Sequence, residues 1–111
     1  MAWLDIEEYT LLGQVPCSAG QLGHVSSIVN VQSVPIGGSS TQSNVLNIKT
    51  RYVRLHCDVN CRYSFGLNPT AVVPSGPAVT TATSSRMAGS QTEYFSVPEG
   101  GNYIVAVIAS T

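Results

Sequence analysis

Apolar and polar side chains alternate along several short segments of the chain, and Gly, Ser, Thr, Asn and Pro are concentrated between these segments. Residues 51–57 show the clearest alternation, with an apolar set and a polar or aromatic set on opposite faces: Val53, Leu55 and Cys57 against Tyr52, Arg54 and His56. A period of two residues predicts a half-buried strand. Helical periodicity is nearly absent, so the pattern predicts an all-β domain.

Residues 61–65 continue the alternation after the short polar segment 58–60. A connection of three residues is typical of a β-hairpin. We therefore expect residues 51–57 and 61–65 to pair as an antiparallel hairpin, which sets Leu55 opposite Tyr63. In the same register, Val53 lies opposite Phe65.

A second hairpin is predicted for residues 92–97 and 103–109, because the segment 98–102 between them contains two adjacent glycines. The segment 103–109 is apolar on both faces, which predicts a central strand covered by a second sheet or by a neighbouring subunit. Three weaker strands are expected elsewhere in the chain, at residues 25–32, 45–50 and 78–83.

Six or seven short strands in 111 residues favour an antiparallel β-sandwich or jelly roll, because two facing sheets bury both apolar faces. A small closed β-barrel is the alternative architecture. Residues 16–111 are expected to form this single domain, since the length suits one hydrophobic core.

The amino-terminal segment 1–15 differs from the rest of the chain in charge. Residues 1–48 carry three acidic and no basic side chains, whereas residues 49–111 have a net charge of +2. The segment is also rich in large apolar side chains, without a clean strand or helix period. We hypothesise an arm that docks on another subunit; the alternative is the first strand of the domain's own sandwich.

Two long, weakly charged connections are expected at residues 35–44 and 67–91. Loops of this length in compact domains are usually functional or disordered, so each is a surface loop or an assembly contact. The second contains the apolar piece 71–73, which we expect to be covered. Together with the amino-terminal segment it supplies the candidate partner interface: Trp3, Leu4, Ile6, Tyr9, Val72 and Val73.

Charged residues make up only 10% of the chain, the net charge is −1 and the isoelectric point is near 6.0. The chain therefore lacks the basic field that nucleic-acid binding requires. Its longest apolar run, residues 103–109, is far shorter than a membrane-spanning helix. The first residues lack the basic and apolar regions of a secretory signal, so we expect synthesis and folding in a reducing cytosol.

The three cysteines, Cys17, Cys57 and Cys61, are too few for a fully paired disulfide framework. Cys57 and Cys61 are expected to be small buried side chains in a reduced chain, or else a cross-strand disulfide. A zinc site built from these two with His24 or His56 is a further alternative, although the spacing falls short of the usual structural-zinc pattern.

No motif predicts catalysis or a cofactor. Gly37-Gly38-Ser39-Ser40 lacks the lysine and spacing of a phosphate-binding loop, and neither histidine stands in a nucleophile motif. The chain is therefore expected not to be an enzyme. Three aromatic residues could stack on sugar if exposed, against packing in the core or an interface: Trp3, Tyr52 and Tyr94. A polar cross-strand cluster is predicted from Arg54, His56, Asp58 and Arg62.

Several short pieces of the carboxy-terminal half resemble small virion structural proteins of tailed bacteriophages: residues 51–57, 63–66, 68–71, 86–88, 93–95 and 105–108. The resemblance covers about residues 50–110. It implies a β-sandwich or jelly-roll protein of the capsid surface, of the head decoration or cement type. Its partner would be the major capsid protein, and copies would associate as dimers or trimers. A carbohydrate- or protein-binding module of the tail or fibre is the alternative.

Overall fold

The computed structural model describes residues 2–10, 28–74, 84–99 and 101–110. The described residues form strands and loops without a helix, which confirms the all-β prediction. The strands are β1 (Ala2–Tyr9), β2 (Ile28–Ile36), β3 (Thr41–Gln42), β4 (Tyr52–Cys57), β5 (Cys61–Gly66), β6 (Ser85–Met87), β7 (Thr92–Ser96) and β8 (Ile104–Ala109).

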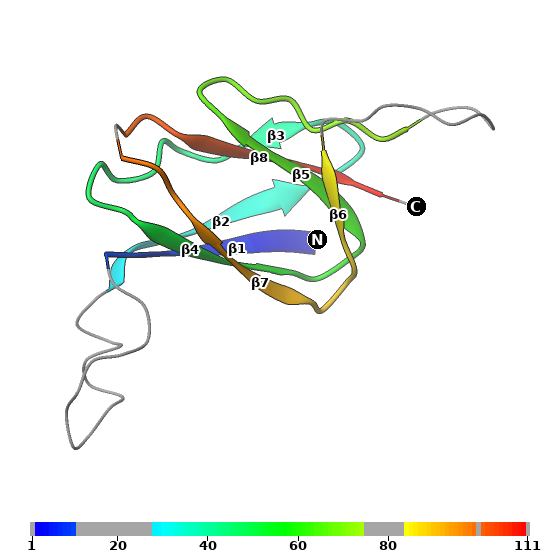
Figure 1. The fold of residues 1–111 in the computed structure, drawn as a ribbon. Helices are drawn as coiled ribbons and strands as arrows, with labels where there is room; N and C mark the ends of the chain where they lie inside the picture. Colours follow the sequence, from blue (N-terminus) through cyan, green and yellow to red (C-terminus); the bar gives the residue numbers. More distant parts are fainter. Residues whose placement is uncertain (1, 11–27, 75–83, 100, 111) are drawn as a thin grey trace, which may run out of the picture.

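The strands form two four-stranded sheets that pack face to face as a β-sandwich (Figure 1). Sheet A has the order β2-β1-β4-β7 and sheet B the order β3-β8-β5-β6. Every strand pair is antiparallel. The predicted antiparallel sandwich is therefore confirmed, and the chain does not close into the alternative barrel.

The core lies between the sheets and is built from the inward-facing side chains that the alternation identifies. Val53, Leu55 and Cys57 of β4 are fully buried, whereas the residues between them are half-buried. Cys61 and Tyr63 of β5 face them from sheet B. Burial of these apolar side chains is the main term that stabilises the two layers against each other.

The first predicted hairpin is wrong, although both of its strands exist. β4 pairs with β1 and β7 in sheet A, and β5 pairs with β8 and β6 in sheet B. Residues 58–60 therefore cross from one sheet to the other. The crossing is held by the 88–91 loop: the Ser90 amide donates to the Cys57 carbonyl at 2.7 Å, and the Gly89 amide to Asn60 Oδ1 at 2.8 Å.

The second predicted hairpin is wrong for the same reason, because β7 belongs to sheet A and β8 to sheet B. Gly101 and Asn102 in the connection adopt φ values of 71° and 65°. Glycine takes this conformation without steric cost. The prediction of a central position for the last strand is confirmed, since β8 lies between β3 and β5.

The weaker predicted strands have mixed outcomes. Residues 25–32 correspond to β2, which begins at Ile28 and extends to Ile36; residues 45–50 form a loop, and residues 78–83 lie outside the described residues. β3 and β6 are short strands inside the two segments predicted as long connections. Residues 67–74 run over β3: the Ala71 amide donates to Ser40 Oγ at 2.9 Å, and Gln42 Nε2 donates to the Pro69 carbonyl at 2.8 Å.

The amino-terminal segment is an inner strand of the domain's own sheet. β1 pairs with β2 on one side and with β4 on the other, with Ile6 opposite Gln32 and Leu55. Leu4 and Ile6 are fully buried in the core. The structure thus corrects the arm hypothesis for residues 2–9, because these residues satisfy their apolar faces within the chain. Residues 1 and 11–15 of the predicted arm lie outside the described part.

Candidate binding site on the open side of the sandwich

The two lateral sides of the sandwich differ in how they are closed. On the first, the closed side, β2 lies close to β3 and β8. The Asn44 amide donates to Gln32 Oε1 at 3.0 Å and so ties the edge of sheet A to the segment that follows β3. Glu8, whose side chain is fully buried, adds to this closure.

The Glu8 carboxylate accepts hydrogen bonds from four donors of the described residues. Oε1 accepts from the Asn47 amide at 2.7 Å and from Thr50 Oγ1 at 2.8 Å. Oε2 accepts from Asn30 Nδ2 at 2.8 Å and from Gln32 Nε2 at 3.3 Å. A buried carboxylate satisfied in this way holds β1, β2 and the 44–50 loop in a single arrangement.

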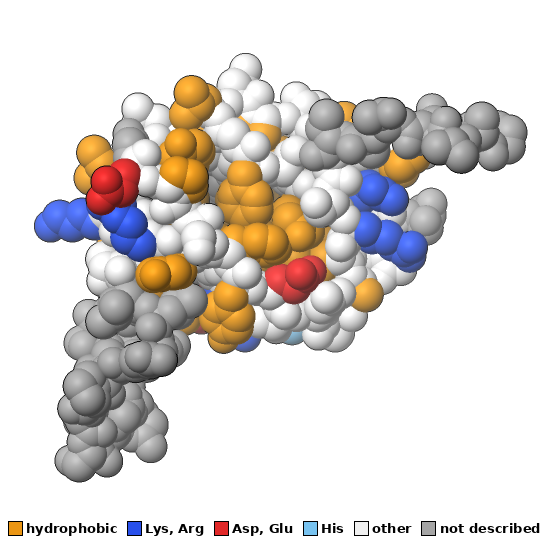
Figure 2. Space-filling model, in the orientation of Figure 1, with side chains coloured by type: hydrophobic (Ala, Val, Ile, Leu, Met, Phe, Trp, Pro, Cys, Tyr) orange, Lys and Arg blue, Asp and Glu red, His pale blue; other side chains and the backbone are white. Residues whose placement is uncertain are grey.

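The second side, the open side, lies between β7 of sheet A and the β5–β6 edge of sheet B. β6 has three residues and, among the described residues, pairs with Cys61–Tyr63. In the part of the chain that the structure describes, no strand pairs with the outer edge of β7. Figure 2 shows apolar side chains gathered at the surface between β5 and β7, with an acidic side chain beside them.

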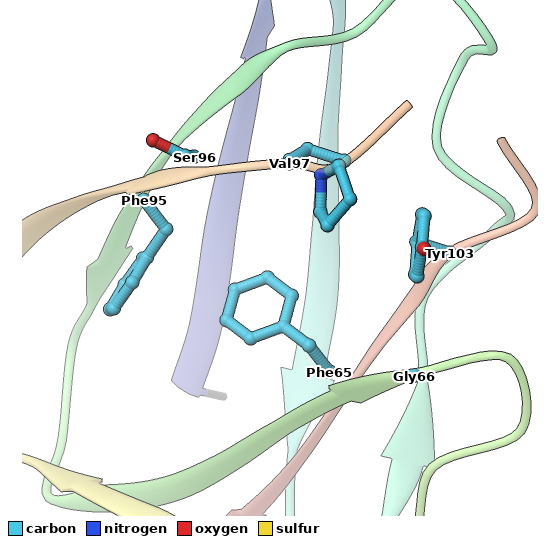
Figure 3. Close-up of a pocket in the computed structure, with 7 residues that line it drawn as sticks. Phe65, Gly66, Phe95, Ser96, Val97 and Tyr103 are labelled. Atoms are coloured by element: carbon cyan, nitrogen blue, oxygen red, sulfur yellow. The ribbon is translucent and has the colours of Figure 1, made fainter. Parts of the chain in front are cut away.

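An apolar pocket of about 220 Å³ opens on this side (Figure 3). Its aromatic walls come from the end of β5, from β7 and from the residue before β8. Phe65 and Phe95 pack with ring centroids 5.3 Å apart, and the Tyr63 ring packs against Phe95 at 5.4 Å in a tilted arrangement. Phe65 nevertheless remains 37% exposed. The full lining is Phe65, Gly66, Phe95, Ser96, Val97, Pro98 and Tyr103.

The lining of the pocket is mainly apolar and aromatic. No charged side chain lines it. Glu93 precedes Phe95 by two residues on β7, and its negative charge interacts electrostatically with the Tyr63 hydroxyl. Burial, and then the Glu93 charge, raise the pKa of Tyr63 above its ordinary value, so this phenol stays protonated at neutral pH.

The structure does not bring the predicted interface residues together. Leu4 and Ile6 are buried in the core, so the prediction that they contact a partner is corrected. Tyr9 is buried outside the core cluster and donates its hydroxyl proton to Glu7, which is a second correction. Burial, followed by the hydrogen bond to Glu7, raises the pKa of Tyr9.

The three remaining predicted interface residues reach the surface at different places. Trp3, on β1, is 39% exposed. Val72, in the segment over sheet B, is 44% exposed, and Val73 is half-buried beside it. The expectation that the 71–73 piece is covered is correct for Ala71 and wrong for Val72.

Trp3 is separated from the other two candidate sugar-stacking residues, Tyr52 and Tyr94, which are diagonal neighbours on β4 and β7. Tyr94 is 55% exposed on the outer face of sheet A, and Tyr52 on β4 is half-buried. Trp3 lies on β1, four residues before Glu7, which is in register with Arg54 and so with Tyr94. The predicted polar cluster is also dispersed. Its contacts are Arg54 with Glu7 at 3.6 Å, His56 with Thr92 at 2.8 Å, Asp58 with the Trp3 amide at 3.0 Å and Arg62 with the Ser84 carbonyl at 3.1 Å.

Cys57 and Cys61 are buried free thiols, so the disulfide alternative is not what the structure has. Cys57 Sγ donates to the Ala88 carbonyl at 3.1 Å. Burial, and then the neighbouring Cys57, raise the pKa of Cys61 to about 12. The zinc site with His56 is not assembled, because His56 faces outward and the thiols face the core; among the described residues no cluster of metal ligands exists. His24 and Cys17 lie outside the described residues.

The pocket residues were not identified as a site from the sequence. The alternation places Phe65 on the inward face of its strand, which is where it lies, but no sequence signal marks β5 and β7 as neighbours across an uncovered side. In the described ranges no helix has the length and apolar character needed to span a bilayer. No protein-family model, curated protein or solved structure matches the chain significantly.

Proposed function

We propose that this chain is a structural virion protein that binds a capsid lattice and stabilises it by bridging neighbouring subunits. The observation that carries the proposal is the open side, where an apolar pocket lies beside an unpaired strand edge. Covering such a surface with a partner makes the free energy of association more favourable by roughly 25 cal/mol per Å² of buried apolar area, before the costs of association.

The composition supports the same conclusion. A surface with few charges has little long-range repulsion against an assembly partner, and the pocket lining is uncharged. A protein that binds only the assembled shell stabilises that shell by mass action. Bridging is therefore enough to raise the resistance of the capsid, and no reaction step is required of the chain.

The experiment is a titration of the protein onto empty mature shells of the tailed phage that, under this proposal, encodes the chain. Wild-type protein should bind saturably and raise the melting temperature of the shell. Phe65→Ser should weaken binding at least about tenfold, because it places a hydroxyl in the apolar pocket. Phe65→Leu should bind nearly as well as wild type.

The matched control is Val31→Ser, which removes an apolar side chain that is 56% exposed on β2, at the opposite edge of sheet A. This variant should bind shells as wild type does. Absence of saturable binding by the wild type would remove the proposal. Equal binding by Phe65→Ser and wild type would remove the open side from it.

A second candidate is a carbohydrate-binding module of the tail or fibre, favoured by the exposed ring of Tyr94. An exposed aromatic side chain next to Arg54 can stack on a sugar ring. Glycan-array hits that disappear in Tyr94→Ala would establish this function, and an array without hits would exclude it for the glycans present.

A further inference from the structure

The backbone of β7 presents hydrogen-bonding groups at an unpaired edge. The Val97 amide donates to the Arg51 carbonyl at 2.7 Å, and the Cys57 amide donates to the Gln91 carbonyl at 3.3 Å. Odd-numbered residues of β7 therefore bond to β4, because bonding alternates along an antiparallel strand. The N–H and C=O groups of the even-numbered residues point away from the sheet: Thr92, Tyr94 and Ser96.

The side chains of Glu93 and Phe95 face the interior beside this edge. Both residues pair with β4 through their own backbone groups, opposite Leu55 and Val53. Toward a strand added outside β7 they would therefore stand in non-hydrogen-bonded pairs. In such pairs the Cα atoms are only about 4.5 Å apart and the side chains are in closest contact.

The pocket has room for one bulky side chain from such a strand. Its volume is about 220 Å³, and Phe95 forms part of its wall. An apolar cavity of about 150 Å³ is sufficient to hold a benzene ring. A large aliphatic or aromatic side chain opposite Phe95 would fill it and cover the exposed edge of Phe65 (Figure 3).

The charge of Glu93 specifies a second position on the added strand. Glu93 accepts a hydrogen bond from Gln91 Nε2 at 3.2 Å, and no Lys or Arg of the described residues forms an ion pair with it. It is half-buried, so a cation directly opposite would interact more strongly than at a fully exposed site. Lys or Arg at that position complements the carboxylate.

We propose that the open side binds an extended segment of a partner protein, which adds to β7 as an antiparallel strand. The segment carries a bulky apolar residue opposite Phe95 and, two residues later, Lys or Arg opposite Glu93. This inference rests on the proposed binding function and adds the chemistry of the partner. Strand addition combines backbone bonds for affinity with alternate side chains for specificity.

A second copy of this chain does not supply that segment from its own sheet edges. β7 and β2 contain no Lys or Arg, and β3 has only two residues. Arg86 in β6 is followed directly by Met87, so these two residues point to opposite faces of the strand. Pairing of β7 with β7 leaves Glu93 opposite Phe95, Val97 or another Glu93, depending on register.

The test is a yeast-displayed library of random nine-residue peptides, sorted for binding to the wild-type protein. Enriched peptides should share a bulky apolar residue followed two positions later by Lys or Arg. Tyr94→Pro removes one outward N–H, at an edge where proline is tolerated, and should weaken these peptides about tenfold. Tyr94→Ala keeps the N–H and should change their affinity less than about threefold.

Glu93→Lys is the second variant, and it does not depend on a proline being accommodated. A library sorted against it should enrich Asp or Glu at the position where the wild type enriches Lys or Arg. Glu99→Lys, at an exposed residue outside β7, is its control and should leave the selected pattern unchanged.

Three results would overturn the inference. They are a library without enrichment, enriched peptides that bind Tyr94→Pro as well as wild type, and a wild-type dimer that Tyr94→Pro converts to a monomer. The last would identify a second copy as the occupant. Shell binding by a wild type that enriches no peptide would leave the proposed function standing without this recognition mode. Enrichment of the pattern without shell binding would support this recognition mode and remove the proposed function.

Discussion

The two lateral sides of this sandwich differ in the chemistry of the side chains that border the core. The closed side ends in a buried carboxylate, Glu8, whose two oxygens accept from four donors. The open side ends in aromatic rings around an apolar pocket, beside a strand edge that no described strand covers. One side is satisfied within the chain, and the other leaves apolar area and backbone groups to a partner.

This contrast shows why a buried hydrogen-bond network suits specification of the fold, whereas an apolar pocket suits binding of a partner. A saturated hydrogen-bond network tolerates few arrangements, because any displaced donor is left buried without a partner. An apolar pocket tolerates many occupants of suitable size, because dispersion and desolvation are not directional. The closed side therefore specifies the fold, and the open side is the part of the described surface available for recognition.

Glu8→Ala is expected to give the largest effect on folding. The substitution leaves four donors around a buried space without their acceptor, and each unsatisfied buried group costs about 1–3 kcal/mol before relaxation. Water entering the space would recover part of this. We expect the free energy of unfolding to fall by roughly 3–5 kcal/mol, measured by urea denaturation.

The control for this variant is Glu99→Gln, which neutralises a carboxylate that lies 3.5 Å from Arg51 at the surface. Exposed ion pairs contribute about 0–1 kcal/mol, so the free energy of unfolding should change by less than that. If Glu8→Ala were as mild as Glu99→Gln, the closed side would not be held by the carboxylate network.

A smaller effect is expected at alkaline pH, from the end of the open side that β6 does cover. Cys61 lies opposite Met87 of β6 and is fully buried there. Its folded-state pKa of about 12 lies above the ordinary value of 9.0. Stability is therefore fully present below pH 9 and falls as the pH rises, because the unfolded chain loses the proton first.

Between pH 9 and pH 10.5 the titration of Cys61 should lower the free energy of unfolding by roughly 1–2 kcal/mol, since one group contributes at most about 1.4 kcal/mol per pH unit. Chemical denaturation at a series of pH values measures this slope. Cys61→Val removes this thiol and should make the slope smaller, while Tyr9 and Tyr63, whose pKa values are also raised in the folded protein, keep part of it. An equal slope in the variant would show that β6 does not seal this end of the side.

The sequence was a good guide to which residues form strands and to which face each side chain takes. The burial of Val53, Leu55 and Cys57 follows directly from their period of two. The same period is compatible with a hairpin in one sheet and with a crossing between two facing sheets, because the inward side chains reach the core either way. For this reason both predicted hairpins had correct strands and wrong partners.

The open side could not be predicted because exposure there depends on long-range pairing. Phe65 has the alternation of a core residue, yet it is 37% exposed, and β6, which begins at Ser85 opposite Tyr63, does not pair with it. Glu8 was equally hidden from the sequence. Its donors come from residues 30, 32, 47 and 50, and only the pairing of β1 with β2 and the path of the 44–50 loop bring them around it.

The smallest effect is expected from Glu7, which is next to Glu8 in the chain but on the opposite face of β1. Its carboxylate lies 3.6 Å from Arg54 and is partly exposed. Water screens this pair, so a double-mutant cycle with Glu7→Gln and Arg54→Gln should give a coupling of about 0.2–1 kcal/mol. Glu7→Gln keeps an oxygen that can accept from the Tyr9 hydroxyl.

The coupling should disappear in 1 M salt, where the Debye length falls to about 3 Å. The Glu8→Ala effect should persist under the same conditions, because buried hydrogen bonds are not screened. Two neighbouring glutamates would then differ several-fold in their contribution, and the one without a charged partner would be the larger. A salt-independent Glu7–Arg54 coupling above about 2 kcal/mol would instead mean that the outer face of sheet A is covered. A partner could then bind that face as well as the edge of β7.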